Sequence, residues 1–183
     1  MTDTLLYSTP WLELRKLVDP EHGIDGYVYS REARCEGNII AVLPFRIEGG
    51  KPEVLLRREV TPCWSDRPMI SAITGGVEKD QTPLDCVVQE LDEEAGYRVH
   101  SSEVAPLGVI FGTKSTDTVY HLFTVDLSLK TNHVPSGDGS YLESLGSCFW
   151  SSRVSSAMDP MVYACFIRMF ACGILGQGLG RFY

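Results

Sequence analysis

The segment 75–97 constrains this chain more than any other, because it marks both ends of one helix and gathers acids along it. Thr82 can serve as the N-cap, Pro83 suits the first helical position, and Asp85 stands where a capping box places an acid. Gly96 follows the last turn, where a left-handed residue commonly ends a helix. The sequence therefore predicts a helix that begins at Pro83 and ends just before Gly96.

Two kinds of side chain gather on adjacent sides of this helix. At about 100° per residue, one arc holds the apolar side chains and predicts the buried stripe, which comprises Leu84, Val87, Val88, Leu91 and Ala95. Glu90, Glu93 and Glu94 fall in the neighbouring arc, beside the core. Three carboxylates are thus gathered on one side rather than spread around the helix.

Such a group of acids is unfavourable without a cation. Like charges repel at neighbouring helical positions, and these acids also lie toward the negative end of the helix dipole. Mg²⁺ or Mn²⁺, which prefer carboxylate oxygen and water, would offset the repulsion and polarise a phosphate. A solvated acidic face is the alternative interpretation, but the glycines before the helix, its caps and the acid spacing together favour a metal site.

The segment resembles the Nudix box, which is a glycine, five residues, a glutamate, seven residues, Arg-Glu, a hydrophobe, any residue, Glu-Glu, any residue, a glycine and a hydrophobe. The residues in register are Gly75, Glu90, Leu91, Glu93, Glu94, Gly96 and Tyr97. The resemblance implies a metal-dependent pyrophosphohydrolase that cleaves the diphosphate of a nucleoside diphosphate linked to another moiety. Metal ligands would be the Gly75 carbonyl, Glu90, Glu93 and Glu94, and Glu90 and Glu93 would be catalytic.

Two positions depart from the family pattern. Gln81 replaces the first glutamate of the motif, and Gln89 replaces the arginine before Glu90. In the family these two charges are commonly structural partners. Because a lone buried charge would be costly, whereas two amides can hydrogen-bond to each other, we expect Gln81 and Gln89 to form a compensated pair.

The order of elements resembles the ADP-ribose and nucleotide-sugar pyrophosphatase branch of the family. That likeness implies substrates of those two types and a homodimer whose N-terminal strands contribute to the interface. In that branch the loop corresponding to 112–118 carries a proline, and a glutamate that assists water activation follows shortly before the next strand. Neither is present, and Asp117 is the nearest acid that could act catalytically in its place.

The rest of the chain reads as a mixed sheet with few helices. Alternating or continuous apolar runs predict strands at 11–17, 26–34, 38–47, 53–60, 69–74, 104–111, 119–127 and 148–150. A hairpin is expected at the Gly49-Gly50 turn, a surface loop at 131–146, and a last helix from Pro160 to about Ala171. With the resemblance, this implies an α/β fold, a Nudix-type α/β/α sandwich with a mixed central sheet and N-terminal antiparallel strands. One domain would span 1–183, with 1–36 as the dimerisation element.

Four residues before the box are candidates for substrate binding. Arg57 and Arg58 lie on a strand leading toward it, and Arg67 lies in the next loop, where a guanidinium would suit phosphate. Trp64, in the same loop, could stack on a base or sugar. Surface ion pairs and ordinary packing are the alternative readings for these side chains. Cys86 is expected to be a small apolar residue, because a hard cation does not select a thiolate.

Composition restricts the partners and the compartment. Acidic residues outnumber basic ones, 24 against 16, for a formal net charge of −8, which argues against nucleic acid as a partner. The chain begins without a signal-peptide pattern, its most apolar stretch is too short to span a bilayer, and its six cysteines follow no zinc or disulfide pattern. We expect a cytoplasmic protein with a small-molecule substrate and no membrane partner.

A rival function belongs to another class. The two glutamines and the absent loop glutamate also suit a catalytically weak or inactive module that uses a Nudix fold to bind a nucleotide or a protein. Retention of Glu90, Glu93 and Glu94 counts against it, because a degenerate site has no reason to keep three crowded acids.

Overall fold

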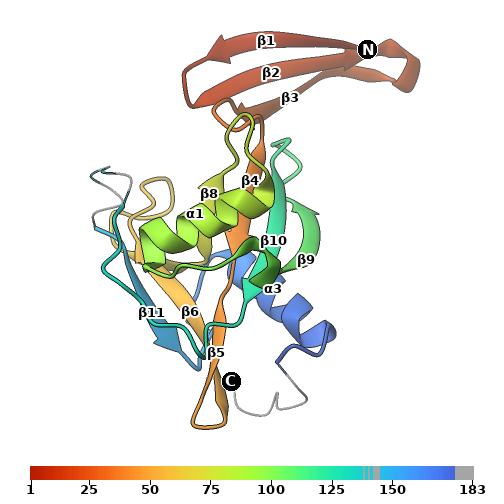
Figure 1. The fold of residues 1–183 in the computed structure, drawn as a ribbon. Coiled ribbons are helices and arrows are strands. Elements are labelled where there is room, and N and C mark those ends of the chain that lie inside the picture. Colours follow the sequence, from red (N-terminus) through yellow and green to blue (C-terminus); the bar gives the residue numbers. More distant parts are fainter. Residues whose placement is uncertain (138, 140, 142–144, 176–183) are drawn as a thin grey trace.

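The computed structural model describes residues 1–137, 139, 141 and 145–175. Its first three strands form a separate antiparallel sheet at one end of the body (Figure 1). These strands are β1 (Thr2–Ser8), β2 (Leu12–Asp19) and β3 (Ile24–Glu32), with a 3₁₀ turn, η1 (Pro20–His22), between the last two. The strand β1 was not among those expected, because its sequence does not alternate and all its residues are exposed.

Two further sheets make up the body. The first is mixed, in the order β8-β4-β10-β9, with β4 parallel to β10. The second has the order β11-β6-β5, and β7 also pairs with β6. Their bounds are β4 (Asn38–Val42), β5 (Phe45–Glu48), β6 (Lys51–Glu59), β7 (Met69–Ser71), β8 (Ile73–Gly76), β9 (Val104–Phe111), β10 (Val119–Val125) and β11 (Ser147–Ser151), with a 3₁₀ turn η2 (Ser101–Glu103) before β9.

The helices α1 (Pro83–Ala95) and α3 (Pro160–Ala171) have the bounds that the sequence predicts and cover opposite faces of the strands (Figure 1). Side chains alternate between the two faces along each strand. Ile40 and Val42 pack in the cluster beneath α1, whereas Ala41 and Leu43 pack in the cluster beneath α3. The α/β/α sandwich expected from the sequence is therefore confirmed.

Two expected strands are each divided between the two sheets. The run 38–47 breaks at Leu43 and Pro44, so that β4 joins the mixed sheet and β5 forms the hairpin with β6. The run 69–74 breaks at Ala72, so that β7 pairs with β6 and β8 pairs with β4. Both sheets are buried at these breaks, so apolar residues continue across each break. The hydrophobic pattern of the sequence therefore did not indicate where either strand divides.

The remaining expectations for local structure mostly hold. The Gly49-Gly50 turn joins β5 to β6 as predicted, and both glycines have positive φ. Part of the expected loop 131–146 lies outside the described residues. None of the helices described is both long and apolar enough to cross a membrane.

Asp159 ties α3 to the break between β7 and β8. One carboxylate oxygen caps the helix by accepting from the Met161 amide at 2.9 Å, and the other accepts from the Ala72 amide at 2.9 Å. The side chain is 3% exposed, and its burial raises the pKa of the carboxyl. Aspartate is a residue type favoured at a helix N-cap, and the structure adds the second bond, to the Ala72 amide.

Asp159→Ala should lower the free energy of unfolding by about 2 kcal/mol or more, because it removes a helix cap and leaves the Ala72 amide buried without its acceptor. Urea denaturation followed by circular dichroism would measure the change. Asp66→Ala in the exposed loop before β7 serves as the control, with an expected change within about 0.5 kcal/mol. Equal effects of the two substitutions would contradict the role assigned to Asp159.

Candidate functional site

The helix α1 is held in place at both ends. The Thr82 hydroxyl accepts from the Asp85 amide and the Asp85 carboxylate accepts from the Thr82 amide, which completes the predicted capping box. Gly96 ends the helix with a φ of 71°, and the Tyr97 amide bonds back to the Leu91 carbonyl at 2.8 Å. These caps fix where the acids of the last two turns lie.

The apolar stripe is close to the prediction. Val87, Leu91 and Ala95 are buried, while Leu84 and Val88 are partly buried against the same cluster. Cys86, which was expected to be an incidental apolar residue, is also buried, and its thiol donates to the Gly76 carbonyl. Burial, with a contribution from Glu90, raises its pKa to about 12, so the thiol stays protonated at neutral pH.

A cavity of about 190 Å³ opens between α1 and β8. We call it the carboxylate cavity, since it is lined by Gly75, Glu90, Glu93 and Glu94, together with Arg34 and Glu78 among others. The structure therefore brings the four candidate metal-binding residues to one place. The three glutamates are only partly exposed, and all three line this cavity.

Gly75 makes the close approach of β8 to α1 possible. A Cβ atom built on this glycine would overlap the Glu90 carboxylate and also the Cγ of that side chain, which would be only 2.6 Å away. Only a residue without a side chain lets the strand lie directly against the acid. In this chain, the need for a glycine at the first position of the motif is therefore steric.

Arg57 is the buried cation of the site. It lies on β6, is 2% exposed, and its guanidinium contacts Glu94 at 3.1 Å and Glu59 at 3.0 Å. Burial alone would lower the pKa of Arg57, but the two carboxylates outweigh this effect and raise it. Burial also raises the pKa of the neighbouring Cys148 thiol to about 11. Arg57 is therefore a buried ion pair and not a surface one. Because its guanidinium neutralises Glu94, it is not available as a separate phosphate-binding cation.

The two glutamines that depart from the motif bond to each other, as expected. The Gln81 amide donates to Gln89 at 2.8 Å, and the Gln89 amide donates to both Glu93 oxygens at 3.2 and 3.3 Å. The Glu78 backbone amide donates to Gln81 at 3.1 Å. Gln89 is exposed, however, so the penalty we assumed for a lone buried charge does not apply at that position.

Arg34 is a residue of the site that sequence reasoning missed. It follows β3, lines the carboxylate cavity, and its guanidinium lies over the Trp11 ring, 5.3 Å from the centroid. A Cβ on Gly76 would lie 3.4 Å from one of its nitrogens. The spacing of residues in the sequence does not indicate that Arg34 belongs to the site. Only the packing of the N-terminal sheet on the body brings Arg34 to α1.

Asp117 occupies a different environment from the one expected. Its carboxylate accepts from the Arg31 guanidinium at 2.5 Å, and its backbone amide donates to the Ser30 carbonyl at 3.2 Å. Both contacts fasten the loop before β10 to β3. Asp117 does not line the carboxylate cavity, so its role here is to connect the N-terminal sheet to the body.

The other candidate substrate-binding residues do not converge with Arg57. Successive residues of a strand point to opposite faces, and Arg58 is exposed, with its guanidinium over the Phe149 ring at 4.9 Å. Trp64, which is 52% exposed, and Arg67 lie in the exposed loop between β6 and β7. None of these three residues lines the carboxylate cavity.

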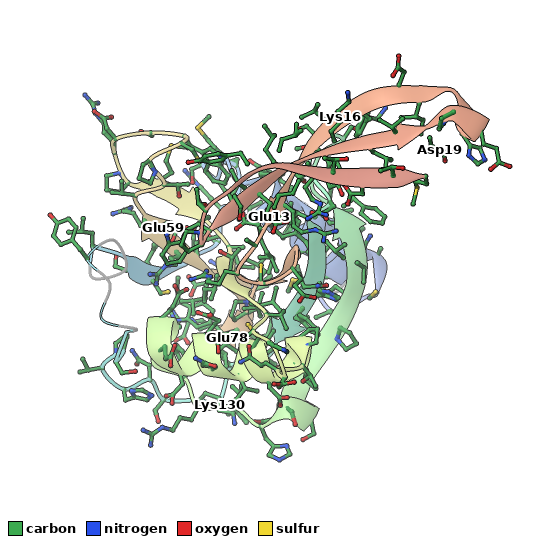
Figure 2. The ribbon with its side chains drawn as sticks, turned by 90° about the horizontal axis from the view of Figure 1, so that it is seen from above. Glu13, Lys16, Asp19, Glu59, Glu78 and Lys130 are labelled. Atoms are coloured by element: carbon green, nitrogen blue, oxygen red, sulfur yellow. The ribbon has the colours of Figure 1, made fainter. Side chains whose placement is uncertain are left out.

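The donor set of the carboxylate cavity fits a hard divalent cation, since it offers carboxylate oxygens beside a close strand backbone. In the part of the chain described, Asp19, Glu21 and His22 have ligand atoms within 4.8 Å of one another, whereas the three glutamates do not. Glu94 is turned to Arg57, and Gln89 holds Glu93. The Asp19 group lies far from α1 and Glu78 (Figure 2), and nothing further indicates a ligand there.

Gly75→Ala should displace the Glu90 carboxylate and weaken Mn²⁺ uptake at least about tenfold, because no Cβ fits between the strand and the acid. Isothermal titration calorimetry of the two proteins would measure this. Gly76→Ala is the matched control, since the added Cβ would lie nearest to the Cys35 Cβ, at 3.2 Å, and not against a glutamate. Unchanged Mn²⁺ uptake in Gly75→Ala would contradict the assignment of the carboxylate cavity as the metal site.

Comparisons with known proteins agree with this geometry. A family model described as NUDIX domain matches residues 37–150, which is more than half of the chain. No curated protein matches. Among solved structures, the chain is similar to the crystal structure of an ADP compounds hydrolase, at 12% identity and a TM-score of 0.66, covering 99% of this chain and 95% of that one. At that identity the likeness supports the fold. The family model, whose match includes Gly75 and the glutamates of the carboxylate cavity, shows that the chain belongs to the Nudix family of hydrolases.

Proposed function

We propose that the protein is a metal-dependent pyrophosphohydrolase that cleaves the diphosphate of a nucleoside diphosphate linked to another moiety, of the ADP-ribose or nucleotide-sugar type. The observation that carries the proposal is the convergence of Gly75, Glu90, Glu93 and Glu94 on one cavity. Family membership supports hydrolysis of a nucleotide derivative. The similar solved structure is of an ADP compounds hydrolase, which supports an adenosine diphosphate derivative.

Mg²⁺ or Mn²⁺ would be held by Glu90, Glu93, Glu94 and the Gly75 carbonyl. When bound, such an ion neutralises charge on phosphate oxygens and lowers the pKa of an attacking water. The cation would also offset the electrostatic cost of placing three acids together, which Arg57 offsets in part at Glu94.

The side chains of the protein have separate tasks in this proposal. Gln89 orients the Glu93 carboxylate, whose oxygens accept a proton from the attacking water. Arg57 holds Glu94 in place, and Arg34, the cation that lines the carboxylate cavity from the N-terminal side, binds the diphosphate. Asp117 has no part in this scheme, because its carboxylate is engaged by Arg31.

We also propose a homodimer that forms through the N-terminal sheet. Tyr7 pairs with Leu14, and Leu12 and Val28 lie on the same face of the sheet. All four are exposed apolar side chains. A second copy of the chain would bury this face, which the two helices leave uncovered as they pack on the other sheets (Figure 1).

Cleavage of a panel of nucleoside diphosphate derivatives, with and without Mg²⁺ or Mn²⁺, tests the proposed function. Turnover of ADP-ribose or a nucleotide sugar that stops on chelation is the expected result. Tight nucleotide binding with no cleavage at any metal concentration would instead favour a binding module, which the two amides in place of the charged pair would also suit.

Glu93→Gln should lower metal-dependent turnover at least about a hundredfold, because the amide neither accepts the proton nor binds the cation as a carboxylate does. The free energy of unfolding should change by less than about 1 kcal/mol, since Glu93 is partly exposed. Steady-state kinetics and urea denaturation measure the two effects. Retained turnover would exclude Glu93 as a catalytic residue.

Leu14→Lys should convert the proposed dimer into a monomer, because a charge at the centre of an apolar interface is desolvated without a partner. Light scattering coupled to size-exclusion chromatography would give the mass of each species. Leu129→Lys, at a side chain that is 98% exposed, is the control and should leave the mass unchanged. A monomeric wild-type protein would contradict the proposal.

A further inference from the structure

A second cavity, of about 580 Å³, adjoins the carboxylate cavity. We call it the Asn38 cavity, and we propose that it binds the sugar that lies beyond the diphosphate, a polyhydroxylated moiety rather than a second nucleobase. This inference rests on the proposed function and adds to it the part of the protein that selects the substrate.

The two cavities share a wall. Arg34 and Glu78 line both of them, so a diphosphate held at the glutamates would have its next group at the entrance to the Asn38 cavity. The Arg34 guanidinium is held over Trp11, which fixes a cation at the boundary. A substrate with one moiety on each side of its diphosphate needs such a neighbouring space.

The chemistry of the walls favours hydroxyl groups. The Asn38 side-chain oxygen pairs with Nε2 of His121 at 3.1 Å, so the ring donates there and leaves Nδ1 as an acceptor. Burial lowers the pKa of His121, which keeps the ring neutral at physiological pH. Lys79 adds a donor, and Glu78 and Asp80 add acceptors. Each sugar hydroxyl both donates and accepts, so it can use both kinds of group.

A nucleobase is a poorer fit for this cavity. Bases are commonly held by stacking on aromatic rings or by apolar walls. No Phe, Tyr or Trp of the described chain lines the Asn38 cavity, and Trp11 meets Arg34 outside it. The apolar lining is limited to small side chains such as Ala33 and Val77.

The backbone around this cavity is unusual. In the described part of the chain, Glu36 and Asp80 are the two residues other than glycine with positive φ, at 50° and 69°, and both line the Asn38 cavity. Such conformations are costly for residues with a side chain and are often found at ligand sites. Glu36 and Asp80 lie in two separate segments that line the cavity, one after β3 and one after β8.

The experiment compares two substrates that differ only in the sugar, ADP-ribose and the β-methyl ester of ADP. In Asn38→Leu and in His121→Leu, kcat/KM for ADP-ribose should fall about tenfold or more through KM, while that for the methyl ester is unchanged. His22→Leu, at an exposed histidine in the turn η1 between β2 and β3, is the control and should alter neither kcat/KM value. Thermal denaturation confirms that each variant folds, and equal losses for both substrates would overturn the proposal.

A second measurement does not depend on turnover. Ribose 5-phosphate, added to the wild-type protein in EDTA, should shift the NMR signals of the His121 ring, whereas inorganic phosphate should not, and Asn38→Leu should remove the response. Signals of the His121 ring that do not shift on addition of ribose 5-phosphate would overturn the proposal. If the ring responds although neither substrate is cleaved, the sugar site stands and only the proposed hydrolysis fails.

Discussion

The mutual repulsion of Glu90, Glu93 and Glu94 is the constraint on which the rest of the structure depends. The fold places these acids in the last two turns of α1, at the negative end of the helix dipole, and partly removes them from water. It offsets part of the cost within the chain, with Arg57 against Glu94 and the Gln89 amide against Glu93. In our proposal a divalent cation at this site would offset more of that cost and would bind the phosphate.

Neighbouring residues hold these three acids in place. The capping box and Gly96 fix the register of α1, and the absence of a side chain at Gly75 lets β8 close one side of the cavity. The two sheets beneath are joined where Ala72 crosses between them, and Asp159 fastens that crossing to α3. A change far from the acids can therefore move the strand that lines them.

The N-terminal sheet connects substrate recognition to assembly in our interpretation. It carries the exposed apolar face that we assign to a second copy, and the turn after β3 delivers Arg34 to the boundary of two cavities. Arg31 and Asp117 fasten the same segment to the loop before β10. The N-terminal sheet thus positions Arg34 at the site and also carries the proposed dimer interface.

The sequence alone determined what depends on neighbours along the chain. The bounds of α1 and α3, the caps of α1 and the Gly49-Gly50 hairpin follow from local spacing and hydrogen-bonding capacity. The resemblance of residues 75–97 to the Nudix box indicated the family and the amide pairing of Gln81 with Gln89. Only the tertiary structure decided which strands divide at Leu43 and Ala72, because apolar runs look alike in either sheet. It likewise decided that Arg57 faces Glu94 while Arg58 turns away, that Asp117 meets Arg31, and that Arg34 reaches the site, since these contacts join segments far apart in the chain.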